Sequence, residues 1–366
     1  MERKIFVKIV SGLLLTFLLT GCLKDNMGPD VPTSKKVMIL NQGNFTEHSA
    51  SISLYDEETK QIQNRAFETV NGRSIGATVV SGSLIGNTAL LVCNYPDKIE
   101  IVDSWTAIAF SEPITEGLAS PRNAIATTNR IYVTNWDYTY NETPSGWWIY
   151  PDSYISIYDI VSRQFIKKVK VGTDAEGLLI IGNKMFVATL EGVKVFEIMG
   201  DNLNFMTVLR PQDTEGGAKH LVVDKNFMVW ASFPGTGVVK IDPNTLTIKT
   251  VVDVPVDSMD GYIASDPMRG KIYTYNTTFD QNYSPVEANI YSVDTSTGQV
   301  SVFYTGTYFY GVGASPYTGN VYTAEVSFTS NSVMKTITPA GLPDGSATTG
   351  VGTFRFLFYL KGDGLD

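Results

Sequence analysis

The sequence predicts an all-β protein, a seven-bladed β-propeller closed by a C-terminal strand that completes the first blade. Three observations support this prediction: a strand motif that recurs along the 366 residues, a composition rich in turn-forming and aromatic residues, and a spare strand at the end of the chain. The 32 Gly, 16 Pro, 19 Tyr and 18 Phe favour many short strands joined by turns over long helices.

The recurring motif is an alternating apolar strand that ends in a bulky residue followed by Asp or Glu. Alternation with a period of two predicts a half-buried strand, and the acid is expected to cap the following hairpin turn with its side chain. The six clear copies end at Asp56, Asp103, Asp159, Glu197, Asp242 and Asp294, and a degenerate seventh spans residues 333–337. One further strand precedes each copy, another lies upstream of it in every unit but the first, and a fourth follows the hairpin, so seven units of about 49 residues indicate a propeller.

The two ends of the propeller sequence supply the closing feature. The first unit starts at Val37 and lacks its innermost strand, whereas residues 354–358 form a strand without a unit of its own. We expect this last strand to complete the first blade, because closure removes exposed sheet edges. A β-sandwich or two β domains are the alternatives, against which the regular spacing argues.

The N-terminus resembles a bacterial lipoprotein signal. Basic residues up to Lys8 precede an apolar run over residues 9–19, and residues 19–22 read Leu-Thr-Gly-Cys. We expect a signal peptide over residues 1–21, a lipidated tether over residues 22–35 with the lipid on Cys22, and the propeller over residues 36–366. An ordinary secretory signal with an incidental Cys is the alternative. Membrane contact is expected through the lipid anchor only.

Charge and metal-ligand content exclude several classes of function. The net charge is −9, and removing residues 1–21 would make it −11, which argues against a nucleic-acid partner. Two His and two Cys are too few for a His- or Cys-rich metal centre. With Cys22 lipidated, Cys93 has no partner for a disulfide and is interpreted as a small core residue. We therefore expect no cofactor and no metal.

The loops that enter the innermost strands carry charged and Tyr residues at corresponding positions of the repeats. We expect these residues to ring one mouth of the central channel, where they either bind a ligand or simply neutralise one another. The predicted ring contains Arg73, Arg122, Glu176, Lys219, Asp260, Tyr308, Tyr310 and Arg355. His220 begins an innermost strand beside Lys219 and is a further candidate ligand-binding residue.

The loops that join the second and third strands of each unit are rich in aromatic residues. The longest covers residues 135–153, and long insertions on one face of a closed scaffold indicate binding. Aromatic side chains provide large, stiff contact areas. The candidate binding residues are Trp136, Tyr138, Trp147 and Trp148 in this loop, and Phe45 and Tyr95 in shorter ones. The alternative is that Trp147 and Trp148 fold back to cover blade edges.

Sequence signatures of enzymes are absent. No Gly-x-Ser-x-Gly, P-loop or Gly-x-Gly-x-x-Gly motif follows a predicted strand. We expect a protein without catalytic residues. A calcium-dependent propeller lactonase is the less favoured alternative, and its channel ligands would be Glu176, Asp260, Asn94 and Asn135.

The repeats resemble the YncE-type, or surface-layer-protein-like, seven-bladed propellers over about residues 36–360. The resemblance rests on the Tyr-Asp and Val-Asp strand ends and on residues 131–135, Ile-Tyr-Val-Thr-Asn. Residues 40–44, Leu-Asn-Gln-Gly-Asn, resemble the start of lipoprotein propellers of gut Gram-negative bacteria, a group that is itself similar to the BtuG cobalamin-binding surface lipoproteins. The resemblance implies a lipid-anchored outer-membrane protein at the cell surface that captures a small molecule, with cobalamin or another corrinoid favoured, for a TonB-dependent transporter. A cell-envelope propeller that binds proteins or glycans is the alternative.

Overall fold

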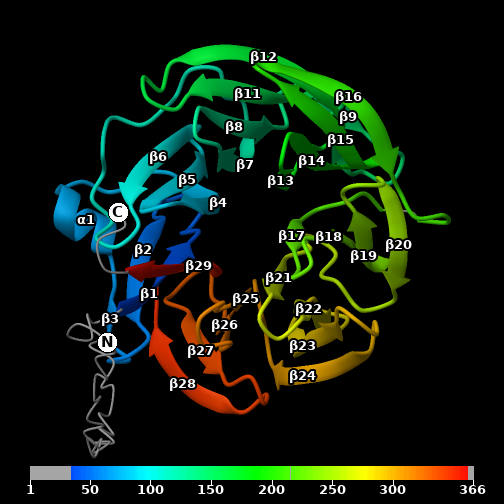
Figure 1. Cartoon of the computed structure of the whole chain (residues 1–366). Helices are drawn as coiled ribbons and strands as arrows, with labels where there is room; N and C mark the ends of the chain where they lie inside the picture. The colour runs from blue at the N-terminus through cyan, green and yellow to red at the C-terminus, as the bar shows by residue number, and fades with distance from the viewer. Residues whose placement is uncertain (1–33, 215, 362–366) are drawn as a thin grey trace, which may run out of the picture. The chain divides into compact units, whose positions relative to one another are not determined.

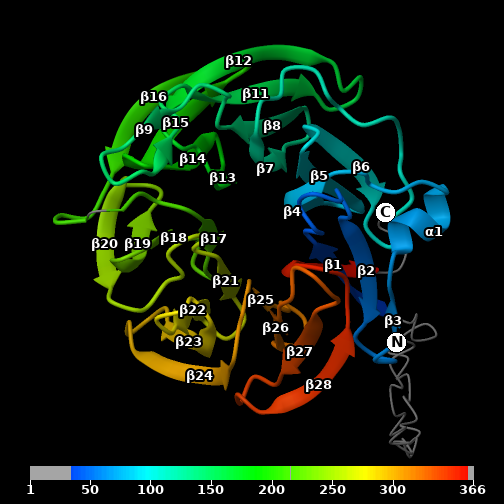
Figure 2. The same cartoon turned by 180° about the vertical axis from the view of Figure 1, so that it is seen from behind.

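The computed structural model describes residues 34–214 and 216–361, and within them seven β-sheets surround a common axis (Figures 1 and 2). The predicted seven-bladed propeller is confirmed. The signal peptide and the lipidation site Cys22 lie outside the described residues. The short helix found in the described part of the chain is not long and apolar enough to cross a membrane.

The blades are numbered from the first strand of the chain, and their strands are given from the axis outward. Blade 1 contains β29 (Thr353–Lys361), β1 (Ser34–Asn41), β2 (Ser51–Asp56) and β3 (Ile62–Gln63); blade 2 contains β4 (Thr78–Ile85), β5 (Thr88–Asn94) and β6 (Lys98–Asp103). Blade 3 contains β7 (Pro121–Ala126), β8 (Arg130–Asn135), β11 (Ser153–Asp159) and β12 (Phe165–Gly172); blade 4 contains β13 (Leu178–Ile181), β14 (Lys184–Thr189), β15 (Gly192–Met199) and β16 (Asn202–Leu209).

The remaining three blades each have four strands. Blade 5 contains β17 (Leu221–Val223), β18 (Val229–Phe233), β19 (Gly237–Asp242) and β20 (Thr247–Val252); blade 6 contains β21 (Ile263–Asp266), β22 (Lys271–Phe279), β23 (Pro285–Asp294) and β24 (Val300–Gly306); blade 7 contains β25 (Gly313–Ala314), β26 (Val321–Glu325), β27 (Val333–Ile337) and β28 (Pro343–Thr348). A separate hairpin of β9 (Asn141–Glu142) and β10 (Trp148–Ile149) lies within the loop between β8 and β11.

Two local features differ from the sequence prediction. The segment between blades 1 and 2 contains a short helix, α1 (Ala66–Asn71), which ends at Gly72 in a left-handed conformation. Blade 2 lacks a regular fourth strand in the described chain, because only isolated bridges to Ile99 and Val102 cover its outer edge.

The ring is closed by β29, as predicted. It pairs antiparallel with β1, so the last strand of the chain completes the blade that the first strand begins. A buried carboxylate of blade 1 also joins it to blade 7: Glu57, which follows β2, accepts hydrogen bonds from Tyr322 Oη at 2.7 Å, Thr318 Oγ1 at 3.0 Å and Ser315 Oγ at 3.3 Å. Hydrogen bonds to a carboxylate are among the stronger ones, so they hold blade 7 against blade 1.

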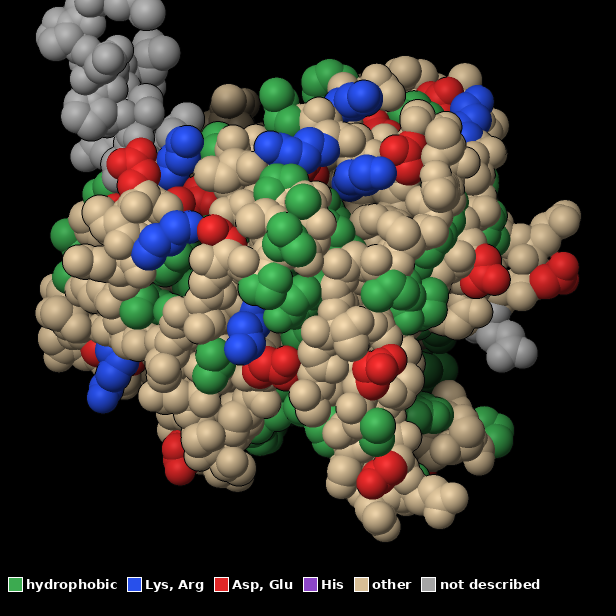
Figure 3. Space-filling view, turned by 90° about the horizontal axis from the view of Figure 1, so that it is seen from below, with side chains coloured by type: hydrophobic (Ala, Val, Ile, Leu, Met, Phe, Trp, Pro, Cys, Tyr) green, Lys and Arg blue, Asp and Glu red, His purple; other side chains and the backbone are tan. Residues whose placement is uncertain are grey.

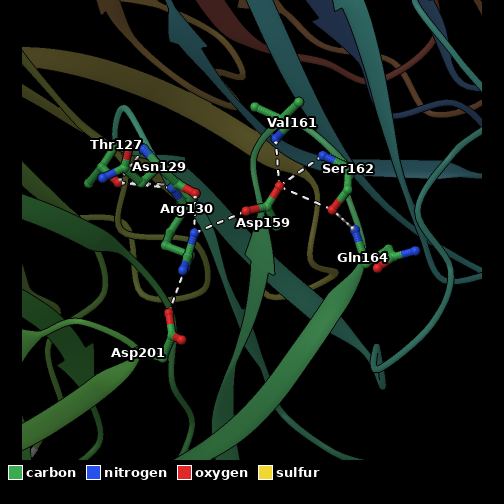
Figure 4. A network of polar contacts seen from close by, with 8 residues as sticks. All are labelled: Thr127, Asn129, Arg130, Asp159, Val161, Ser162, Gln164 and Asp201. Carbon is green, nitrogen blue, oxygen red and sulfur yellow. Dashed lines mark hydrogen bonds and ion pairs between the residues drawn. The ribbon is translucent and has the colours of Figure 1, made fainter.

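The acids at the strand ends cap their turns. Asp159 Oδ1 accepts hydrogen bonds from the backbone N–H groups of Val161 at 3.0 Å and Ser162 at 2.8 Å (Figure 4). Its other oxygen pairs with Arg130, whose Nε also reaches Asp201 of blade 4 at 2.6 Å. Equivalent caps occur at Asp56, Asp103, Asp242 and Asp294, whereas Glu197 instead accepts a bond from Asn183.

Hydrophobic clusters lie between neighbouring blades. Phe186 and Val195 of blade 4, for example, pack in one cluster with Phe233 and Ile241 of blade 5. Cys93 is fully buried, as its apolar sequence context predicted, and burial raises the pKa of its thiol to about 12. On the edge of the propeller seen in Figure 3, acidic and basic side chains are interspersed, with small groups of hydrophobic side chains between them.

Candidate functional site

Two sets of loops open on the same side of the ring, which we call the loop face. One set enters the innermost strands and the other joins the second and third strands of each blade. Residues from both sets line one cleft there: Ser120 precedes β7, whereas Tyr95 and Tyr138 belong to loops of blades 2 and 3. The loop face therefore brings together most of the residues that the sequence singled out.

Charged and aromatic side chains from several blades meet around the axis of the loop face. We call them the axial cluster, and its members are Arg122, Glu176, Lys219, His220, Asp260, Tyr262, Tyr310 and Arg355. Glu176 receives Arg122 Nε on one carboxylate oxygen and Lys219 Nζ on the other, both at 3.0 Å. Burial of Glu176 opposes its ionisation, but the two cations outweigh burial and lower its pKa to about 2. These three side chains join blades 3, 4 and 5.

Tyr262, which the sequence analysis does not single out, forms the centre of the cluster. Its hydroxyl donates to the Val80 carbonyl of blade 2 at 3.5 Å, so the side chain reaches across the axis. The His220 ring stacks on it with 4.3 Å between ring centres, and the Arg355 guanidinium lies 5.7 Å from its centre. Burial, with the nearby Arg355 charge, lowers the pKa of His220 to about 3, so the imidazole is neutral at pH 7.

The other members complete one side of the cluster. Burial and the neighbouring Asp257 raise the pKa of Asp260 to about 6. Tyr310 packs against Phe328 and Phe354, with ring centres 5.0 and 6.1 Å apart. Burial and the nearby Asp260 raise the pKa of Tyr310 well above its ordinary value.

Two residues of the predicted ring lie elsewhere. Arg73 forms a bidentate pair with Glu100 of β6 at 2.8 Å and packs over Phe67 of α1, so it belongs to blade 2 rather than to the axial cluster. Tyr308 lies farther out and contacts Phe279 edge to face at 5.8 Å. The predicted ring rests on corresponding positions in the repeats. That correspondence fails for Arg73, because its guanidinium pairs with the buried carboxylate of Glu100.

Aromatic side chains form a second feature, which we call the aromatic cleft. It encloses about 360 Å³ and is lined mainly by Tyr95, Asp97, Tyr138, Tyr140, Trp148 and Tyr150. The Tyr140 and Trp148 rings lie 4.9 Å apart, and the Tyr138 hydroxyl donates to Asp97. Trp147 and Trp148 are 68% and 59% exposed, so they do not cover blade edges as the alternative interpretation required. Phe45 packs on Tyr95 at 4.7 Å and extends the aromatic surface.

Side-chain contacts link the axial cluster to the aromatic cleft. The Arg122 guanidinium lies 4.0 Å from the centre of the Trp136 ring, and Trp136 stacks on Tyr150 at 4.6 Å. Cation–π contact and stacking fix these side chains relative to one another. The indole N–H of Trp136 is buried and has no hydrogen-bond partner among the described residues. The Arg122–Trp136–Tyr150 stack therefore connects the charged groups near the axis to the rings of the aromatic cleft.

A family model matches residues 35–339, which is most of the chain. The chain belongs to the DUF5074 family, a domain of unknown function. No curated protein matches it.

Solved structures share the DUF5074 chain's fold. A candidate 6-phosphogluconolactonase from Bacteroides fragilis aligns with a TM-score of 0.62 and 12% identity over 92% of this chain and 100% of its own. A quinonprotein alcohol dehydrogenase-like protein from Bacteroides thetaiotaomicron aligns with a TM-score of 0.59 and 15% identity over 88% and 78%. AztD from Citrobacter koseri aligns with a TM-score of 0.54 and 9% identity over 92% and 100%. Identities this low establish the fold alone.

Two of the four calcium ligands that the lactonase alternative would use, Glu176 and Asn135, have other partners in this DUF5074 domain. Both oxygens of Glu176 face cations, and the Asn135 amide bonds the backbone of Val133 and Ala119 and the Ser156 hydroxyl. Across residues 34–214 and 216–361, no group of three or more His, Cys, Asp and Glu side chains is arranged to hold a metal ion. The loop face instead offers stacking surfaces beside charged anchors.

Proposed function

We propose that the protein is a non-enzymatic binding protein that holds a bulky, partly apolar ligand on the loop face. The observation that carries this proposal is the pair of exposed rings, Tyr140 and Trp148, held in mutual contact beside charged groups that reach to the axis. Rings already fixed in place lose little conformational entropy on binding, so stacking on them contributes efficiently to affinity. Sites for such ligands combine apolar walls with a few polar anchors.

The ligand that we favour is a corrinoid such as cobalamin, captured at the outer-membrane surface for a TonB-dependent transporter. The broad, partly apolar macrocycle of a corrinoid suits the aromatic cleft, and its polar side groups suit the axial cluster. The lipoprotein-like residues 1–22 and the similarity of residues 40–44 to surface lipoproteins support the proposed location. Cys22 would carry the lipid that anchors the protein.

A second candidate is a propeller that binds glycans or proteins of the cell envelope. Exposed rings outside the aromatic cleft favour it, because Tyr283 is 89% exposed and Trp147 68% exposed. Such rings would serve a flat, extended partner better than a compact small molecule.

The test has two parts. The purified protein is equilibrated with cyanocobalamin and desalted, and ligand-free protein is titrated separately with cyanocobalamin in a calorimeter. We expect a red protein and a Trp148→Ala variant that binds about 10- to 30-fold more weakly, since aromatic side chains that become buried against a ligand dominate binding. The matched control is Phe227→Ala, because Phe227 is 70% exposed but lies in the turn between β17 and β18, away from the loop face.

Three outcomes would count against the proposal. A colourless protein at micromolar concentration discards the corrinoid. If that protein is retained on immobilised cell-envelope polysaccharide, the second candidate replaces the first. If cyanocobalamin binds but Trp148→Ala leaves the affinity unchanged, the ligand binds away from the aromatic cleft.

A further inference from the structure

Arg355 is a cation near the axis of the propeller that has no carboxylate partner among the described residues. It lies on β29 opposite Leu40 of β1, and its guanidinium extends over the Tyr262 ring. Within the described parts of the chain, the guanidinium forms no hydrogen bond or ion pair with a carboxylate. Burial lowers the pKa of Arg355, which is the direction expected for a charge that burial penalises and no acid offsets.

The neighbouring acids are engaged elsewhere. Both carboxylate oxygens of Glu176 are taken by Arg122 and Lys219. Asp260 is hydrogen-bonded by Tyr310, and burial with the neighbouring Asp257 raises the pKa of Asp260. Burial and the positive charge of Arg355 both lower the pKa of the His220 imidazole. The Arg355 charge therefore acts on its neighbour.

This position is not fully sealed from solvent. Arg355 and His220 are only partly buried, although both lie close to the axis. A partly buried, unpaired guanidinium lowers the stability of the folded state unless a bound anion compensates it. Its planar donors match the two oxygens of a carboxylate or a phosphate.

We propose that Arg355 is the main group of an anion-binding site at the axis, and that it takes an oxyanion, either a carboxylate or a phosphate group. The neutral His220 imidazole supplies a second donor through its ring N–H. The Tyr262 ring contacts both side chains, because His220 stacks on it and the Arg355 guanidinium lies over it. The inference rests on the proposed function in that this anion would be part of the ligand that lies on the loop face.

The experiment measures thermal unfolding at pH 7 with inorganic phosphate, sodium acetate or sodium chloride at matched ionic strength. The variants are Arg355→Met, Arg355→Lys and a control, Arg130→Gln, which alters a paired arginine in the network of Figure 4. Phosphate stabilises folded proteins generally by exclusion from their surface, so the readout is the shift of each variant relative to the wild type. We expect phosphate at ten times its dissociation constant to raise the wild-type Tm by about 2 °C more than that of Arg355→Met.

Two further results are expected. Arg355→Met should be at least as stable as the wild type in chloride, because it removes an uncompensated charge, and Arg355→Lys should retain part of the phosphate shift. The control Arg130→Gln should retain all of it. A larger shift with phosphate than with acetate would identify a phosphate group, and the reverse a carboxylate.

The inference is overturned if Arg355→Met is markedly less stable than the wild type in chloride, which would make Arg355 a structural residue. It is also overturned if phosphate and acetate shift the wild type and Arg355→Met equally. Neither result depends on cyanocobalamin binding, so failure of the anion site and failure of the proposed function are told apart.

Discussion

Glu176→Gln is the perturbation that tests the electrostatics of the axial cluster most directly. The two cations lower the pKa of Glu176 from 4.5 to about 2, and a shift of this size corresponds to about 3 kcal/mol of stabilisation. The Arg122 and Lys219 side chains are 20% and 26% exposed, so screening by water reduces the expected loss to about 2 kcal/mol. Urea unfolding at pH 7, followed by tryptophan fluorescence, measures this loss.

The pH dependence of the same variant gives a second, independent number. A carboxylate whose pKa is lowered in the folded state stabilises the protein above the unfolded pKa of 4.5, and the contribution is lost as the pH falls towards 2. We therefore expect the difference in unfolding free energy between the wild type and Glu176→Gln to shrink by about 1 kcal/mol between pH 7 and pH 3.5.

A control variant separates this effect from the general loss of a carboxylate. Asp152 pairs with Lys170 at an exposed site, and Asp152→Asn should change stability by less than about 0.5 kcal/mol at pH 7. The reasoning is refuted if Glu176→Gln unfolds at the wild-type urea concentration. It is also refuted if the difference from the wild type is the same at pH 7 and pH 3.5.

The remaining predictions concern closure of the ring, and urea unfolding measures both. Glu57→Ala leaves buried hydroxyls of blade 7 without their acceptor and should lower the unfolding free energy by about 3 kcal/mol. Tyr322→Phe removes one of these hydrogen bonds and should lower it by about 1 kcal/mol. Equal losses in the two variants would contradict this account. Gly311→Ala would bring a Cβ to 1.9 Å from the Phe354 carbonyl at a φ of +126° and should cost more than 3 kcal/mol. Gly146→Ala, with positive φ but open space, should cost about 1 kcal/mol, and a similar cost at Gly311 would refute the clash.

Patterns confined to one hairpin could be predicted from the sequence. The acid of each motif caps a turn two or three residues away, as at Asp159 and Asp242, so its role follows from local spacing. The seven units and the displaced last strand follow from the same repetition. Helix α1 and the incomplete edge of blade 2 could not be predicted, because neither repeats elsewhere in the chain.

The candidate site was predicted only in part. Equivalent positions in the repeats placed Arg122, Glu176 and Lys219 together, and the structure joins them. The same correspondence misplaced Arg73, and it did not identify Tyr262. Their roles depend on which side chains from other blades lie within reach, and no pattern along the chain encodes those distances.

The amino-acid sequence by itself determined that the chain forms seven small sheets, that its tail closes the ring, and that charged and aromatic loops gather on one face. These follow from alternation, turn chemistry and repetition, which act over a few residues. Only the tertiary structure decided that Glu176 pairs with two cations while Arg355 has no carboxylate partner among the described residues. It also decided that Trp136 connects the axial cluster to the aromatic cleft. Ion pairing and ring contacts fall off within a few ångströms, so they are fixed by the packing of blades that lie far apart in the sequence.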